Sequence, residues 1–294
     1  MNFENYLIST QTLIISTNIN IECQKFFEKI QCDNISKPIS GKTRMLVNQG
    51  DNIKDGSIVY TQYKKNFKGT LFKKISEKFF LNSVTIIMKI NTKFINIKVS
   101  NKGKLQITGC NENVPILCIL QKFWEIIHNL DNEKTSPLWK FSNENDTEFK
   151  AMIIPVMCNI NFSINFQINR ELLNTIINTQ TNHISILEPS DGYVGVNIKI
   201  SAKDELLEDM YIDEYILKDG EKWCKEKRKF MDYINTLSQK EQKKKIAKCY
   251  INTFLVFYSG KVIMSGGISY RNRKKAYDTF MNIIDRYRDN IIAQ

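Results

Sequence analysis

The sequence predicts an α+β protein made of two related halves, each giving strands to an antiparallel sheet and helices to one of its faces. Two hairpin-like segments support this class, because residues 100–109 and 257–266 each carry apolar residues on both sides of a Gly–Lys turn. A helix-like segment follows each hairpin. The shared order of these elements indicates a duplicated unit.

The duplication rests on matches at one constant spacing along the chain. Gly103 corresponds to Gly260, and Lys104 corresponds to Lys261. The other matches continue through the hairpin into the next helix: Thr108 with Ser265, Gly109 with Gly266, and Phe123, Ile126 and Ile127 with Phe280, Ile283 and Ile284. One match would carry no weight, whereas a constant spacing across two elements predicts an internal repeat.

The first half is taken as residues 1–140. Apolar periodicity predicts a strand at 13–20 and then a helix at 21–30, with Phe26, Phe27 and Ile30 on one side. Residues 32–80 are interpreted as an insertion, loop-like up to residue 54 and basic and amphipathic, as in a short helix, from residue 64. The remaining predicted elements are strands at 56–63, 82–90, 94–99 and 104–108, and a helix at 114–130 with Pro115 in its first turn.

The second half is taken as residues 141–294, after a polar boundary at 131–146. Its first strand, 153–166, alternates between an apolar side (Cys158, Ile160, Phe162, Ile164 and Phe166) and a polar side (Asn159, Asn161, Ser163 and Asn165). A helix at 168–177, strands at 192–200, 253–257 and 261–265, and a closing helix at 271–292 follow. Residues 203–250 match nothing in the first half and are expected to be an inserted helical excursion, acidic at first and basic later.

The composition narrows the function classes. The chain has 294 residues and a formal net charge of +11, which favours nucleic acid first and an anionic membrane surface second. A solvated surface produced by a coding bias toward Lys, Asn and Ile would give the same charge.

No apolar run is long enough to span a bilayer, and we expect no signal peptide. Seven scattered cysteines and two histidines show no zinc-binding spacing, so we expect reduced thiols, no metal and no cofactor.

The two faces of the predicted sheet differ in chemistry. The apolar face is expected to pack under helices through Ile95, Ile97, Val99, Leu105 and Ile107 in the first half, and Phe254, Val256, Val262 and Met264 in the second. The opposite face carries Asn96, Lys98, Ser100, Gln106 and Thr108 in the first half, and Thr253, Leu255, Phe257, Ile263 and Ser265 in the second. This face must meet water or a ligand. Apolar, hydroxyl and amide groups beside lysines suit the minor groove of DNA, where base edges offer few hydrogen bonds and contact is largely by shape.

At these hairpins the sequence resembles the TATA-box-binding protein family, whose two halves each carry Ile-Phe-x-Ser-Gly-Lys-x-x-x-Thr-Gly. The second half here has VFYSGKVIMSG at 256–266, and the first half has VSNKGKLQITG at 99–109. Shorter similar stretches are IIST at 14–17, IIMKI at 86–90 and FQIN at 166–169. The resemblance implies a saddle with helices on its convex face. Such a saddle binds AT-rich DNA in the minor groove, bends it, and recruits RNA polymerase subunits and a general factor similar to transcription factor IIB.

The resemblance also implies roles for single residues. Phe257 and Tyr193 correspond to a pair of aromatic wedges that enter the base stack at one end of the saddle. The lysines expected at phosphates are Lys89, Lys98, Lys104, Lys199 and Lys261. The residues expected at the groove floor are Gln106, Thr108, Leu255, Ile263 and Ser265, with Asn159 and Asn161 in place of the family's groove-reading asparagines. Ordinary sheet aromatics and a solvated lysine rim are the alternative interpretation of the same residues.

The first half departs from the family at its wedge positions. These fall on Ser100 or Val99 and near Ser83, and none of them is aromatic. Because a missing wedge leaves a base step stacked, we expect a shallower bend and a weaker sequence preference. The departures, the insertions and the AT-biased composition resemble a homologue encoded by a large cytoplasmic DNA virus. That origin implies the host cytoplasm (viral factory) or the virion, and a cellular member would be nuclear.

Two other functions are weighed against DNA binding. The same saddle could be a protein-docking scaffold of a transcription complex that has lost specific DNA bending. An enzyme is disfavoured, because the sequence shows no paired carboxylates at strand ends, no Gly-rich phosphate loop and no nucleophile with an evident base. Asp204, Glu205, Glu208 and Asp209 are expected to form a solvated helix face within the insertion.

Overall fold

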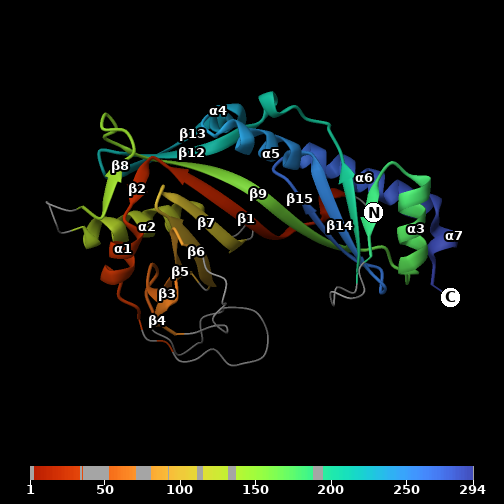
Figure 1. The fold of residues 1–294 in the computed structure, drawn as a ribbon, viewed down its shortest axis with the longest axis horizontal. Coiled ribbons are helices and arrows are strands. Elements are labelled where there is room, and N and C mark those ends of the chain that lie inside the picture. The colour runs from red at the N-terminus through yellow and green to blue at the C-terminus, as the bar shows by residue number, and fades with distance from the viewer. Residues whose placement is uncertain are drawn as a thin grey trace. The chain divides into compact units, whose positions relative to one another are not determined.

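The computed structural model describes residues 3–33, 35, 53–70, 81–91, 93–110, 115–131, 137–187 and 195–293 (Figure 1). The chain forms two compact units. The N-terminal unit comprises Thr12–Ile154 and Asp213–Lys227, and the C-terminal unit comprises Met1–Gln11, Pro155–Ile212 and Arg228–Gln294. The units differ from the expected halves, because residues 1–11 belong to the C-terminal unit, and residues 141–154 and 213–227 belong to the N-terminal unit. The boundary of the sequence repeat near residue 140 stays a prediction.

The N-terminal unit is an antiparallel sheet with two helices. Its strands run in the order β1-β7-β6-β5-β3-β4, and β2 pairs separately with β8. The elements are β1 (Ile8–Thr17), β2 (Ile19–Ile21), α1 (Cys23–Lys29), β3 (Ile58–Tyr63), β4 (Asn66–Gly69), β5 (Ser83–Ile90), β6 (Lys93–Ser100), β7 (Lys104–Cys110), α2 (Ile116–Leu130) and β8 (Trp139–Phe141). The hairpin of β12 (Tyr211–Lys218) and β13 (Lys222–Lys229) is attached to β9 (Phe149–Ser163).

The C-terminal unit repeats this plan with the strand order β10-β11-β14-β15-β9. Its elements besides β9 are α3 (Arg170–Gln180), β10 (Ile184–Ile186), β11 (Gly195–Ser201), α4 (Phe230–Asn235), α5 (Gln239–Cys249), β14 (Ile251–Phe257), β15 (Lys261–Gly266), α6 (Tyr270–Arg286) and α7 (Arg288–Ile291), with short 3-10 turns at Phe3–Asn5 and Leu207–Asp209. The predicted α+β class with an antiparallel sheet is therefore confirmed. The arrangement of the two units as a saddle stays a prediction.

Each unit buries one face of its sheet under helices. Phe26 of α1 lies edge-on to Phe123 of α2, with ring centroids 6.3 Å apart, and Phe254 of β14 stacks on Phe280 of α6 at 4.4 Å. The residues predicted for the apolar face are all buried. Burial of a large apolar side chain contributes about 1.5–3 kcal/mol. The two-residue period of the strands thus decides which face carries the helices and which stays open.

The turns of the two hairpins are built in the same way. Gly103 and Gly260 have φ angles of 64° and 74°, a region that glycine enters without strain. A Cβ at either position would lie 2.1 Å from a backbone carbonyl oxygen, that of Ile19 or that of Phe166. Each of these carbonyls belongs to the residue four places before the first helix of its unit. The same helix-entry segment therefore supports the same turn twice, as a duplication predicts.

Backbone hydrogen bonds repeat the same pattern. The N–H of Ile21 donates to Asn101 O at 2.9 Å, and the N–H of Ile168 donates to Tyr258 O at 2.8 Å. Ile21 and Ile168 each lie two residues before a helix, and Asn101 and Tyr258 match at the repeat spacing. The two hairpins are therefore equivalent in hydrogen bonding as well as in shape.

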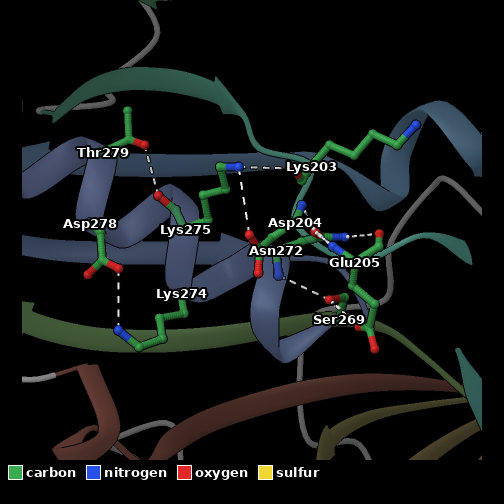
Figure 2. A network of polar contacts seen from close by, with 9 residues as sticks. All are labelled: Lys203, Asp204, Glu205, Ser269, Asn272, Lys274, Lys275, Asp278 and Thr279. Carbon is green, nitrogen blue, oxygen red and sulfur yellow. Dashed lines mark hydrogen bonds and ion pairs between the residues drawn. The ribbon is translucent and has the colours of Figure 1, made fainter. Parts of the chain in front are cut away.

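The sequence led us to expect a helical excursion at 203–250. This expectation is wrong, because the segment contains strands as well as helices. Its middle is the β12–β13 hairpin, and only α4 and α5 are helices longer than a single turn. The expected acidic helix face is also wrong for Asp204 and Glu205, which lie before the first turn of the segment. These two residues bind α6 instead (Figure 2): Asn272 Oδ1 accepts from their backbone N–H groups at 2.6 and 2.9 Å.

A second correction concerns the first insertion. The basic stretch at 64–80 was expected to be a short helix, but Asn66–Gly69 is strand β4, paired with β3. Lys68 on this strand donates to three carbonyl oxygens at the end of α1, those of Phe27, Glu28 and Ile30. A lysine at a helix C-terminus is favourable because it satisfies the last carbonyls. Residues 71–80 and most of the predicted loop at 32–54 lie outside the described residues.

Candidate nucleic-acid interface

The face of the C-terminal sheet opposite α3 and α6 is called the C-terminal open face. Its side chains form rows across the strands, because register pairs Asn197 with Leu255, Leu255 with Ile263, and Ile263 with Asn161. The neighbouring row is Lys199, Thr253, Ser265 and Asn159. These side chains are partly or fully exposed, whereas their neighbours along each strand are buried. The predicted outward orientation of Leu255, Phe257, Ile263 and Ser265 is therefore confirmed.

Phe257 lies at one end of this face and not beneath the helices. A shallow hollow beside it is lined by residues of β9, β14 and β15, among them Asn161, Ser163, Lys261 and Ile263. Phe257 and Ile263 are partly exposed, and Lys261 is exposed. The ring therefore stands at the rim of an accessible apolar surface with a cation beside it.

Asn159 is fixed by neighbours within the same unit. Its Oδ1 accepts from Ser265 Oγ at 2.8 Å, and its Nδ2 donates to Thr10 Oγ1 at 3.1 Å. Its backbone carbonyl also accepts from Ser9 Oγ at 3.0 Å. Asn161, two residues along β9, is exposed. Asn159 is thus held in a hydroxyl–amide network, and Asn161 is the more accessible amide.

The register identifies the cross-strand neighbour of Phe257 as Gly195. A Cβ at Gly195 would lie 2.7 Å from Leu255 Cδ1, so the Leu255 side chain occupies the space above this glycine. Tyr193, the predicted partner wedge, lies outside the described residues.

The sequence analysis missed two members of the C-terminal open face. Ile184 and Ile186 of β10 pair with Lys199 and Asn197, which adds them to the ends of the two rows. Their exposed fractions are 61% and 39%, so both side chains are accessible. An apolar residue at every second position of a three-residue strand is too short a pattern to be recognised in the sequence.

The equivalent surface of the N-terminal unit is called the N-terminal open face. Register pairs Thr85 with Lys98 and Lys98 with Gln106, and the next row is Ile87, Asn96 and Thr108. Lys98, Gln106, Thr108 and Lys104 are partly exposed, as predicted. Ser100 stands at the position of Phe257, and its Oγ accepts from the backbone N–H of Lys104 at 3.0 Å. At the position equivalent to Phe257, the N-terminal open face therefore has a small hydroxyl group that is hydrogen-bonded within its own turn.

The first insertion covers part of the N-terminal open face. Ile87, Phe94 and Tyr60 form a buried cluster with Val59, and Ile35 and Ile53 pack against it. Lys89 lies at this end and forms an ion pair with Asp55 at 3.0 Å, with 15% of its side chain exposed. A lysine already neutralised in this way is a poor phosphate ligand, so the predicted role of Lys89 is disfavoured by its surroundings.

Among the described residues, no three histidine, cysteine, aspartate or glutamate side chains are grouped to hold a metal ion. Burial raises the pKa of the Cys23, Cys110 and Cys249 thiols to about 11, so these thiols stay protonated at neutral pH. None of the helices within the described ranges is long and apolar enough to cross a membrane.

Comparisons with known proteins identify a viral relative. The uncharacterized protein 335L of Invertebrate iridescent virus 6 is 31% identical over 247 residues, which cover 80% of this chain and 69% of the relative. Among solved structures, Methanococcus jannaschii TBP is similar over 96% of this chain and 98% of its own, with a TM-score of 0.47 and 11% sequence identity. No family model matches the chain.

Proposed function

We propose that this chain, which belongs to the same family as the uncharacterized protein 335L of Invertebrate iridescent virus 6, binds duplex DNA in the minor groove through its open faces. The main observation that supports minor-groove binding is the composition of the C-terminal open face. On this face apolar, hydroxyl and amide side chains alternate in register, and lysines lie at the edges. Leu255, Phe257 and Ile263 are partly exposed on one sheet face, and a ligand that covers them would remove this apolar surface from water.

The chemistry of this face fits AT-rich sequence. In the minor groove, A·T and T·A pairs present only acceptors, and a G·C pair adds the N2 amino group of guanine. Apolar side chains such as Ile263 pack closely on a floor without that group, and Asn161 can donate to the acceptors. Phe257 stands at the end of the face, where a ring that enters a base step would kink the duplex. Flexible pyrimidine–purine steps lower the cost of such a kink.

The proposed biological role is in transcription initiation. The DNA-bound protein would present its helix-covered side to RNA polymerase subunits and to a general factor similar to transcription factor IIB. This part of the proposal depends on the resemblance of residues 99–109 and 256–266 to the TATA-box-binding protein hairpin motif. Capture of the viral or host polymerase by the DNA-bound protein, but not by DNA alone, is the expected result.

A base-substitution experiment tests minor-groove binding directly. Binding of the full chain to an AT-rich duplex is measured by fluorescence anisotropy, alongside duplexes in which A·T pairs are replaced by inosine·cytosine or by G·C pairs. An inosine·cytosine pair keeps the minor groove of A·T and changes the major groove, so affinity should be retained there and lost with G·C. Equal affinity for all three duplexes would refute groove recognition. Absence of DNA binding together with capture of the polymerase would favour the protein-docking scaffold.

A further inference from the structure

Helix α5 of the second insertion carries an exposed row of lysines. Lys240, Lys244 and Lys248 follow one another at intervals of four residues, and Lys243 lies beside them. All four are exposed, and none forms a hydrogen bond or ion pair within the described part of the chain. Each interval of four residues rises about 6 Å along the helix, so the row presents charge along most of α5.

This arrangement is unfavourable for the helix itself. Like charges four residues apart destabilise a helix by roughly 0.2–0.5 kcal/mol per pair, and Lys240–Lys244 and Lys244–Lys248 are two such pairs. Lys240 and Lys243 also lie near the helix N-terminus, where the macrodipole disfavours cations. A sequence chosen only for helix stability would have interspersed glutamates, as in ordinary exposed helices. The cost indicates that the charge is kept for a partner.

The other side of α5 is partly buried. Lys245 is half-buried over the ring of Tyr233, with its Nζ 5.0 Å from the centroid, and burial lowers its pKa. The Glu241 carboxylate accepts from the backbone N–H of Ser238 at 3.3 Å and fixes the start of the helix. The helix before it, α4, buries Phe230, Tyr233 and Ile234. The lysine row therefore lies on a helix whose other side contacts α4 through Lys245 and Tyr233.

The start of the second insertion is attached to α6 (Figure 2). Asn272 is buried and accepts from the backbone of Asp204 and Glu205, while Ser269 Oγ donates to the Glu205 carboxylate at 2.6 Å. The lysine row lies on α5, which contributes no residue to the rows of the C-terminal open face.

We propose that the lysine row of α5 (Lys240, Lys243, Lys244 and Lys248) binds the phosphate backbone of duplex DNA independently of sequence. Ammonium groups spaced along a helix can contact successive phosphates of a DNA strand. The row offers neither the apolar surface nor the hydrogen-bonding groups that recognition of a base sequence needs. This second contact would hold DNA flanking the groove-bound site, or a separate duplex.

The test compares two pairs of lysines on the full chain, with a G·C-rich duplex as the probe. K243Q/K244Q removes two unpaired charges of the row. K274Q/K275Q is the matched control, because Lys274 is paired with Asp278 at 3.3 Å and Lys275 with Asp204 at 3.7 Å (Figure 2). Circular dichroism checks that both variants fold, and affinity is measured at several salt concentrations.

Each phosphate contact contributes about 0.9 to the slope of log affinity against log salt. K243Q/K244Q should therefore lower the slope by about 2 and the affinity at about 0.1 M salt by roughly tenfold or more, while the control pair changes both much less. Equal effects of the two pairs would overturn the proposal. Loss of binding to anionic vesicles or to an acidic protein, with unchanged DNA binding, would also overturn it.

This result is separable from groove recognition. Because the G·C-rich probe does not depend on the AT preference, the effect of K243Q/K244Q should persist in the F257A background. If the affinity is equal for the A·T, inosine·cytosine and G·C duplexes while K243Q/K244Q still weakens binding, the phosphate contact of α5 is supported and groove recognition is refuted.

Discussion

The two open faces share one backbone plan and differ in almost every functional side chain. Row for row, Leu255 and Ile263 of the C-terminal unit correspond to Lys98 and Gln106 of the N-terminal unit, and Phe257 corresponds to Ser100. The N-terminal face is also partly covered by Ile35 and Ile53. Duplication therefore preserved the turn and the register, which the fold needs, while the exposed positions diverged. In the proposed DNA complex, the C-terminal face would make close contact with the groove, and the N-terminal face would make polar contacts, including contacts with phosphates.

The largest expected effect tests the shared backbone plan. Gly103→Ala and Gly260→Ala each place a Cβ 2.1 Å from a carbonyl oxygen at a positive φ angle. We expect each to lower the free energy of unfolding by about 2 kcal/mol or more, by similar amounts in the two units. Urea denaturation provides the measurement. Gly220→Ala, also at positive φ but in open space, is the control and should cost less.

The next effect tests the difference between the faces. Phe257→Ala should weaken binding to an AT-rich duplex by about tenfold and reduce bending, because aromatic–base stacking contributes roughly 1–3 kcal/mol. Ser100→Ala, at the matching position, should leave both nearly unchanged. Energy transfer between dyes at the duplex ends reports the bend. Equal effects of the two changes would remove the distinction between the faces.

The converse change attempts to restore the missing wedge. Ser100→Phe places a ring at the N-terminal counterpart of Phe257 and should increase the bend of the duplex. The affinity should not fall, and any gain in affinity should be a few-fold at most. The ring must displace the Ser100–Lys104 turn contact, so an unfolding measurement accompanies the bending assay. An unchanged bend in a stable variant would show that the N-terminal open face does not approach the groove.

The smallest expected effect distinguishes Lys261 from Lys89, two lysines that were both predicted from the sequence to contact phosphates. Lys261→Gln should lower the salt slope of DNA binding by about 0.9, because Lys261 is exposed beside Phe257. Lys89→Gln should change the slope little, because Lys89 is already paired with Asp55. A slope change for Lys89 as large as that for Lys261 would mean that the ion pair opens when DNA binds.

The repeat, the hairpins and the side of each strand that faces the helices could all be predicted from local patterns in the chain. These features depend on local rules, since a two-residue period fixes the faces of a strand and a turn at positive φ requires glycine. For this reason the buried and open residues of β6, β7, β14 and β15 were predicted correctly.

What covers or neutralises the exposed positions could not be predicted in this way. That Lys89 meets Asp55, that Ile35 and Ile53 pack on the N-terminal open face, and that Ile184 and Ile186 extend the C-terminal one depend on contacts between distant segments. The mixed strand and helix content of the second insertion has the same cause, because β12 forms where the free edge of β9 offers it a partner. Local patterns carry no information on such partners, since hydrogen bonding and burial between remote segments are settled only when the chain folds.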